Sequence, residues 1–448
     1  MFSRKVIKAI KVCLSKFKGS KLINACFVTL LYSGVSFANG QFSNHVLKID
    51  EAVSLATQNN PGLAKMQARY RALKEVPSQA GSLPDPMLML NAMNFPTDTF
   101  NIKQEPMTQL QVGVSQAFPF PGKLSLRKQA SEYEAIAASH SVEEVRQQII
   151  SHVKQSWWQL FFLDRALEVI NKNQDLMRQL LEVARKKYEV GKGLQQDVLL
   201  AQLELSKLLD QEIELKSMRN HENIKLNVLM DVPPNEKAAL PNSMPEFIEN
   251  NWVEEDLYSQ AETARSALRE KKDLQEAAKS KLNLSKKGYY PDFKVSVAYG
   301  HRRGENPPPK RGERADFLSV MLNASIPIYA GSKQSKEICQ RAQELEKSRF
   351  DVVDTLSKVR SEVSMALTDL EQAKEQFSLF KTGIIPQAQQ TVSSMLAAYQ
   401  VNKVDFLNLV RSQITLFNYE LQYWKAFTAS QQALARLTAA VGEESANE

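Results

Sequence analysis

Two different spacings of apolar residues follow one another along this chain. Short segments alternate apolar and polar side chains, as in residues 109–115, where leucine or valine occupies the second, fourth and sixth positions. A period of two predicts β-strands with one apolar and one polar face. Long segments instead repeat apolar residues every three or four positions, which is typical of amphipathic helices. The sequence therefore predicts a mainly α-helical protein with a small β part.

Four strands are predicted, in two pairs joined by polar loops. The first pair covers about 84–94 and 107–118, and the second about 291–301 and 315–328. Each pair is entered through Pro-Asp, a dipeptide that breaks a helix. Three of the strands have clear apolar faces: Leu110, Val112 and Val114; Phe293, Val295, Val297 and Tyr299; and Leu318, Val320, Leu322, Ala324 and Ile326.

The predicted helices are long and pack along narrow seams. A first helix covers 49–80, with an interruption at Asn59-Asn60-Pro61. Residues 125–188 contain no Pro or Gly, and as one helix they would extend for roughly 95 Å. In the last helix the apolar residues are spaced 3, 4, 3, 4 and 3 apart, which is a coiled-coil seam: Leu407, Val410, Ile414, Phe417, Leu421 and Trp424.

One stretch occurs twice, at a constant offset of 211 residues (188 against 399). Tyr-Glu-Val-Gly-Lys begins at Tyr188, and Tyr-Gln-Val-Asn-Lys begins at Tyr399. Gly191 and Asn402 tolerate the left-handed conformation that ends a helix. We therefore predict two helical hairpins with tips at about 188–197 and 399–408, in a chain of two tandem repeats. The alternative is a chance pair of helix turns, which the matching Pro-Asp strand entries disfavour.

The domain organisation follows from these repeats. Residues 1–38 contain seven basic and no acidic residues, an apolar run from Leu22 to Phe37, and a small residue at Ala38. This pattern predicts a signal peptide, and a retained signal anchor is the alternative. The first repeat covers 39–232, a proline-rich linker covers 233–251, and the second repeat covers 252–448. After residue 38 no segment approaches the ~20 apolar residues of a membrane-spanning helix.

Charge and cysteine content exclude several classes of protein. The chain has 57 Lys and Arg against 50 Asp and Glu, and removal of the seven cations in 1–38 leaves 50 against 50. This balance gives no reason to expect nucleic acid as a partner. Cys13 and Cys26 lie in the predicted signal peptide, so Cys339 remains alone and no intrachain disulfide is expected.

No catalytic, cofactor or metal site is predicted. The histidines are scattered without a second ligand at metal-site spacing, and no phosphate-binding loop or nucleophile motif occurs: His45, His140, His152, His221 and His301. Met87, Met89 and Met93 alternate on one face of the first strand. Thioethers bind soft Cu(I), but side chains that pack in a barrel or face lipid are the alternative.

Half-polar strands about ten residues long match tilted transmembrane β-strands. Four strands cannot close into a barrel, and each unpaired backbone group at an open edge in lipid costs several kcal/mol. Several copies of the chain would therefore have to pool their strands. A small soluble sheet that covers one end of a helical bundle is the alternative.

The chain resembles the TolC-type outer-membrane efflux proteins, or outer membrane factors, over essentially the whole mature sequence. The resemblance is carried by the Pro-Asp entries, by the two tips and by one N-terminal segment: Ala52-Val53-Ser54-Leu55-Ala56 with Asn59-Asn60-Pro61-Gly62-Leu63. Residues 116–127, which join the second strand to the long helix, resemble the same junction in the heavy-metal efflux branch.

This resemblance implies a homotrimer in the outer membrane of a Gram-negative bacterium. Four strands per protomer would form a twelve-stranded barrel in lipid, continued by an α-helical tunnel in the periplasm. The tips would dock onto a periplasmic adaptor (membrane fusion protein) that connects to an inner-membrane RND pump. The implied function is a passive export duct, with heavy-metal cations as the expected substrates, and not an enzyme. A periplasmic coiled-coil adaptor or scaffold is the alternative, although such proteins usually have one helical hairpin.

Candidate functional residues lie at the tips. Asp405, Asn408 and Arg411 are spaced by three, so they share one helix face, and threefold symmetry would turn each into a ring around a pore. The resemblance places acidic rings where this chain has Asn408 and Arg411, so those rings cannot be transferred. A solvated helix face is the alternative. The resemblance also suggests Tyr399 for a hydrogen-bonded latch, and the tips suggest an adaptor-docking set: Gly191, Lys192, Asn402 and Lys403.

Overall fold

The structure is a computed structural model that describes residues 46–242 and 252–442. The predicted signal peptide and residues 243–251 of the predicted linker lie outside the described residues. The chain divides into two units, 1–43 and 44–448, and all of the described helices and strands belong to the second unit.

The N-terminal helical segment is interrupted where proline occurs. It consists of α2 (Ile49–Asn59), α3 (Pro61–Lys74) and α4 (Val76–Gly81). Asn60 separates the first two helices, because its side-chain oxygen accepts hydrogen bonds from Gly62 N (2.8 Å) and Leu63 N (3.3 Å). Pro61 then occupies the first turn of α3, where a missing N–H costs nothing. The predicted interruption is confirmed, and Pro77 accompanies a second break that the single range 49–80 missed.

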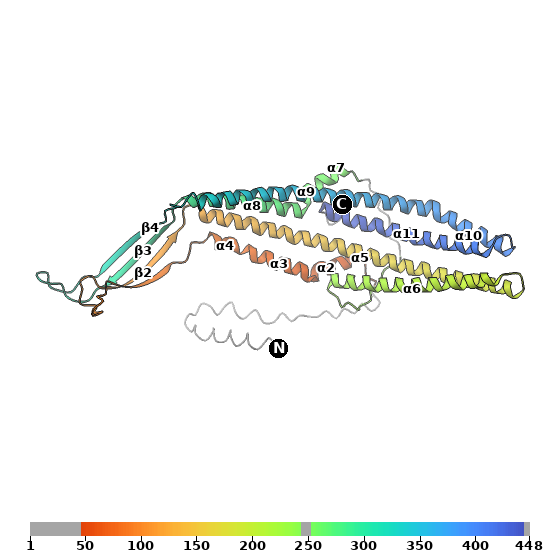
Figure 1. The fold of residues 1–448 in the computed structure, drawn as a ribbon, viewed down its shortest axis with the longest axis horizontal. Coiled ribbons are helices and arrows are strands. Elements are labelled where there is room, and N and C mark those ends of the chain that lie inside the picture. The colour runs from red at the N-terminus through yellow and green to blue at the C-terminus, as the bar shows by residue number, and fades with distance from the viewer. Residues whose placement is uncertain (1–45, 243–251, 443–448) are drawn as a thin grey trace. The chain divides into compact units, whose positions relative to one another are not determined.

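Long helices make up most of the described chain. The first repeat contributes α5 (Lys123–Glu189), of 67 residues, and α6 (Gln195–Met230). The second repeat contributes α7 (Glu254–Ala264), α8 (Ser266–Lys286) with the short turn η1 (Lys287–Tyr289), α9 (Gln334–Leu379), α10 (Ile385–Gln400) and α11 (Phe406–Val441). The hairpins α5–α6 and α10–α11 lie side by side, with both tips at the end away from the strands (Figure 1).

A π-helical turn, η2 (Phe380–Ile384), connects α9 to α10 without ending the helix. Pro386 lies in the first turn of α10. Proline lacks the N–H for the usual helical hydrogen bond, and its ring clashes with the carbonyl four residues earlier. A π-turn accommodates this disruption by shifting the hydrogen-bond register locally.

The four strands form one antiparallel sheet in the order β1-β2-β3-β4. They are β1 (Met87–Met93), β2 (Gln109–Phe118), β3 (Phe293–His301) and β4 (Phe317–Ala324). The two repeats meet at the β2–β3 pair, where Val112 is opposite Tyr299 and Val114 is opposite Val297. The strand β4 ends at Ala324, short of the expected 328, and Pro327 has no N–H to extend the ladder.

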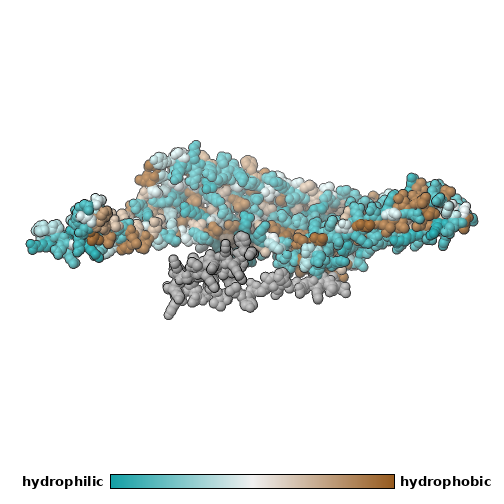
Figure 2. All heavy atoms as spheres, turned by 60° about the horizontal axis from the view of Figure 1, so that its bottom comes forward, coloured by the Kyte–Doolittle hydropathy of each residue, from teal (hydrophilic) through white to brown (hydrophobic). Residues whose placement is uncertain are grey.

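The sheet exposes its apolar face and buries polar groups on the other. In β2, Val112 and Val114 are 46% and 51% exposed, whereas Gln111 and Ser115 are 7% and 1% exposed. The exposed apolar face continues across all four strands: Leu88, Leu90, Val112, Val114, Val297, Tyr299, Leu318, Val320 and Leu322. Hydrophobic atoms gather over the strand region at the left of Figure 2. The predicted alternation is therefore confirmed, and this face requires an apolar covering.

The helices pack around an aromatic cluster on α5, α9 and α11. Trp158 meets Phe427 edge to face at 5.7 Å, and Phe161 and Phe377 lie at 6.4 and 5.5 Å from the same Phe427 ring. Trp157 Nε1 donates to the carbonyl of Leu47 at 3.0 Å. This bond fixes the start of the described chain to the middle of α5.

Arg265, between α7 and α8, connects this junction to three other helices with one side chain. It is 7% exposed, and its guanidinium lies 2.9 Å from Glu144 Oε1 on α5 and 3.2 Å from Glu362 Oε2 on α9. It also donates to the carbonyl of Ala439 on α11. Removal of the arginine would leave Glu144 buried without its counter-ion.

We expect Arg265→Ala to lower the free energy of unfolding by about 3–5 kcal/mol, because an unpaired buried charge is left behind. The matched control is Arg360→Ala, which breaks an exposed pair with Glu262 and should cost less than about 1 kcal/mol. Guanidinium unfolding of the purified protein in detergent, followed by helical circular dichroism, measures both. Equal losses in the two variants would contradict the role given to Arg265.

Candidate functional site at the helical tips

The two tips have the same backbone hydrogen bonds. In the first, Gly191 N donates to Tyr188 O and Lys192 N donates to Lys187 O. In the second, Asn402 N donates to Tyr399 O and Lys403 N donates to Ala398 O. This pair of bonds is the Schellman helix ending, in which the residue after the cap is left-handed.

The left-handed residues are those singled out in the sequence. Gly191 has φ +69° and Asn402 has φ +59°, values that Gly and Asn adopt more readily than other residues. The side chains of Lys192 and Lys403 are exposed next to them. All four residues of the predicted docking set are thus at the tips and open to a partner, and their docking role stays a prediction.

Lys187 connects the first tip to the second. Its Nζ donates to the carbonyl of Tyr399 at 2.5 Å and to Asn402 Oδ1 at 2.7 Å. The same ammonium lies 4.0 Å from the centre of the Tyr399 ring, within the range of a cation–π contact. A single side chain of α5 therefore binds the end of α10.

An apolar cluster lies beneath this contact. Tyr399 is 5% exposed, and its ring packs against Phe406 with the centres 5.2 Å apart. Residues from α5, α6 and α11 complete the cluster: Ile170, Met177, Ala184, Ala201, Leu409, Val410 and Phe417. The tips are thus held by hydrophobic packing inside and by Lys187 outside.

The contact of Tyr399 with Lys187 uses its carbonyl and its ring. Its hydroxyl is buried and has no hydrogen-bond partner among the described residues. Burial, together with the nearby Asp197 carboxylate, raises the pKa of Tyr399. The role of Tyr399 in a hydrogen-bonded latch stays a prediction.

Asp405, Asn408 and Arg411 share one exposed face of α11, as their spacing predicts. Buried positions of the same helix, such as Phe406 and Leu409, lie between them. Asp405 precedes the helix as its cap, but its side chain makes no capping hydrogen bond. All three side chains are open to solvent in one chain, and a ring of them around a pore stays a prediction.

Asp197 and Lys187 were missed in the sequence, although the repeat could have revealed them. At the repeat offset, Lys187 corresponds to Ala398 and Asp197 to Asn408. These are positions where the two copies differ in charge. Burial, with a smaller effect from the Asp405 carboxylate, raises the pKa of Asp197. The carboxylates of Asp197 at the first tip and Asp405 at the second are thus close enough to repel each other.

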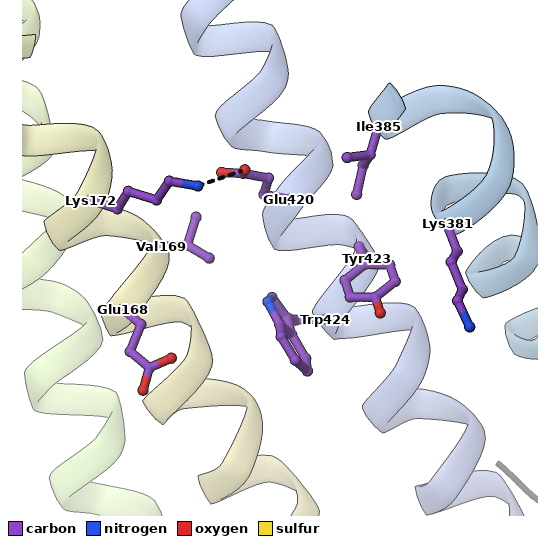
Figure 3. Close-up of a pocket in the computed structure, with 8 residues that line it drawn as sticks. All are labelled: Glu168, Val169, Lys172, Lys381, Ile385, Glu420, Tyr423 and Trp424. Carbon is purple, nitrogen blue, oxygen red and sulfur yellow. Dashed lines mark ion pairs between the residues drawn. The ribbon is translucent and has the colours of Figure 1, made fainter. Parts of the chain in front are cut away.

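A groove runs between α5 and α10 from the tips towards η2. Near the tips it has a volume of about 550 Å³ and apolar walls that include Leu176, Val183 and Leu396. Beyond them it continues into the pocket of Figure 3, where Lys172 of α5 and Glu420 of α11 approach to 3.6 Å. The groove separates the two hairpins on this face of the protomer.

Buried amides pair α5 with α11 at the floor of the groove. Gln413 Nε2 donates to Asn173 Oδ1 at 2.8 Å, and Asn173 Nδ2 lies 3.4 Å from Glu420 Oε2. Gln413 and Asn173 are only 5% and 2% exposed. A shifted helix register would leave these buried groups unpaired, so they fix the register of the coiled coil.

The described segments hold no group of three or more His, Cys, Asp and Glu that could bind a metal ion. In the same segments no helix combines the length and the apolarity needed to cross a membrane.

We expect Lys187→Ala to loosen the second tip, because the Tyr399 carbonyl and the Asn402 side chain lose their common donor. Amides in 395–410 should then exchange hydrogen at least several-fold faster, as read by mass spectrometry. The control Lys186→Ala removes an exposed neighbouring charge and should leave these rates unchanged. Unchanged exchange in Lys187→Ala would show that packing alone holds the tip.

The raised pKa of Asp197 predicts a pH-dependent tip. Stabilisation by the protonated form is complete below the ordinary carboxyl value of 3.8 and disappears as the pH rises through the raised value. Amide protection at the tips, corrected for intrinsic exchange rates, should therefore increase as the pH falls from neutral. Asp197→Asn should show the greater protection already at neutral pH. A variant with the wild-type pH dependence would contradict this assignment.

Comparison with known proteins identifies a family with this sequence pattern. The family model described as "Outer membrane efflux protein" matches residues 52–230 and 257–443. The cobalt-zinc-cadmium resistance protein CzcC of Cupriavidus metallidurans is 20% identical over 405 residues, with 88% of this chain and 90% of CzcC covered. The outer membrane protein TolC of Vibrio cholerae is 21% identical over 307 residues, with 66% and 69% covered.

Solved structures share the fold. CusC, described in terms of transmembrane channel formation, superposes with a TM-score of 0.73 at 15% identity, covering 88% of this chain and 92% of CusC. The outer-membrane channel OprN gives a TM-score of 0.73 at 14% identity, with 88% and 89% covered. The tandem helix, strand-pair and hairpin arrangement is thus that of TolC-type channels. Because the family model matches most of its length in both repeats, this chain belongs to the outer membrane efflux protein family.

Proposed function

We propose that the protein is the outer-membrane duct of a tripartite efflux system. Three copies would pool their strands into a twelve-stranded barrel in the outer membrane, and their helices would form a tunnel in the periplasm. The observation that carries this proposal is the four-stranded sheet with an exposed apolar face and two open edges. Such a sheet suits lipid only when its edges are paired.

The exposed face supports a position in lipid. Leu90, Leu318 and Leu322 are 75%, 71% and 69% exposed on the same side of the sheet. In a water-soluble protein, a patch of this size in contact with water would favour aggregation. Lipid tails would cover these side chains, while the opposite face, with Gln111 and Ser115, would line a hydrated channel.

The tips would be the periplasmic gate. Lys187 holds the second hairpin to the first, and the face of Asp405, Asn408 and Arg411 would point to the pore when three copies assemble. An adaptor that competes for Lys187 or Asn402 would free the end of α10 from Lys187 of α5. The duct would hydrolyse nothing, and the energy for transport would come from an inner-membrane RND pump through that adaptor.

The proposed substrates are heavy-metal cations. The support is the sequence similarity to CzcC, whose name refers to cobalt, zinc and cadmium resistance, and the strand-to-helix junction at 116–127. A duct takes what its pump delivers. Metal tolerance of cells that lack the gene, measured with and without the restored protein, tests this part separately.

Membrane fractionation tests the proposal as a whole. The protein should be found in the outer membrane, leave it only with detergent, and run as a trimer that dissociates on heating. Its reconstitution into planar bilayers should give discrete conductance steps. A soluble periplasmic species without conductance would instead support the adaptor or scaffold alternative.

Single-channel recording tests the gate residues. With threefold symmetry, Asp405→Ala removes three negative charges and should reduce the preference for cations, whereas Arg411→Ala removes three positive charges and should increase it. The reversal potential in a salt gradient measures both shifts. Asp256→Ala, a charge change in α7 far from the tips, is the control. Identical reversal potentials in all variants would exclude the two residues from the gate.

A further inference from the structure

The methionines of the sheet all lie on one face. Its four methionines in the described strands are Met87, Met89 and Met93 in β1, and Met321 in β4. Met87 is opposite Ser115, Ser115 is opposite Ser296, and Ser296 is opposite Met321. Residues directly opposite each other in a sheet point to the same side. All four thioethers therefore lie on the polar face.

Hydrophobic packing does not account for this placement. The apolar face has leucine, valine and tyrosine but no methionine in the described strands. On the polar face, Met87, Met93 and Met321 are 58%, 39% and 44% exposed. Methionine is thus absent from the apolar face, and the residues directly opposite the methionines on the polar face are serine, glycine and glutamine.

The spacing in β1 suits a shared ligand. Alternate residues of a strand lie about 6.6–6.8 Å apart along the same face. The methionine side chain has three rotatable bonds, so the sulfur atoms of Met87 and Met89 can converge on one ion. Asn91 and Met93 continue the same row. No charged residue belongs to this row, which disfavours hard cations that need carboxylates.

We propose that the β1 methionines form a binding site for a soft monovalent cation, Cu(I) or Ag(I), on the channel face of the sheet. Neutral thioethers prefer such ions over Zn²⁺ and other borderline divalent cations. This inference rests on the proposed function, because it narrows the substrate class of the duct. A row of exposed, uncharged ligands would bind weakly and release the ion onward.

A ligand competition measures the site directly. Protein purified in detergent is treated with N-ethylmaleimide, so that the exposed thiol of Cys339 cannot bind metal. It then competes for Cu(I) with acetonitrile, a weak Cu(I) ligand, under ascorbate. The wild type should withdraw Cu(I) from acetonitrile, and Met87→Leu/Met89→Leu/Met93→Leu should bind at least tenfold more weakly. Met218→Leu/Met365→Leu, which replaces two exposed helical methionines, should match the wild type.

Leucine has nearly the volume of methionine, so the variants should fold, and the single variant Met89→Leu provides a milder change. Equal Cu(I) affinity in the wild type and the triple variant, or no Cu(I) binding by the wild type, would overturn the inference. The conductance of the same preparations in planar bilayers tests the proposed channel function independently of Cu(I) binding. A triple variant that conducts normally but has lost Cu(I) supports the site, whereas a wild type that binds Cu(I) without conducting contradicts the duct alone.

Discussion

The unpaired backbone N–H and C=O groups along the two outer strands, β1 and β4, constrain the rest of the molecule. Beyond β1 and β4 no further strand of the described chain continues the sheet. One face of the sheet is apolar and exposed. In an apolar surrounding each unpaired N–H or C=O costs several kcal/mol, and in the proposed assembly each edge pairs with another copy of the chain. The alternating sequence pattern thus produces the apolar face, and the unpaired edges are the reason for proposing a shared barrel.

The helical end of the molecule shows how a duplicated sequence acquires asymmetric contacts. Both tips use the same Schellman ending, yet Tyr188 is 48% exposed and Tyr399 is 5% exposed. Tyr399 is covered by the apolar cluster of α5, α6 and α11. Lys187 also reaches across to the second tip and has only alanine at the equivalent position of the other copy. One hairpin thereby holds the end of the other.

Periodicity predicted much of this fold, because the strands and long helices are specified by local patterns. The faces of β2 and the uninterrupted α5 followed from alternation and from the absence of Pro and Gly. Contacts between distant segments could not be predicted in this way. Lys187 meets residues more than 200 positions later, and the buried hydroxyl of Tyr399 depends on packing from several helices. The side of the sheet on which the methionines lie required the strand register.

Hydrogen exchange of the edge amides, in protein extracted from the outer membrane, tests the central claim most directly. If copies of the chain pair β1 with β4, amides along Met87–Met93 and Phe317–Ala324 should be protected as strongly as those of the inner strands. Alternate amides of β1 and β4 that exchange freely while β2 and β3 stay protected would mean that the edges remain open, and the shared barrel would be excluded.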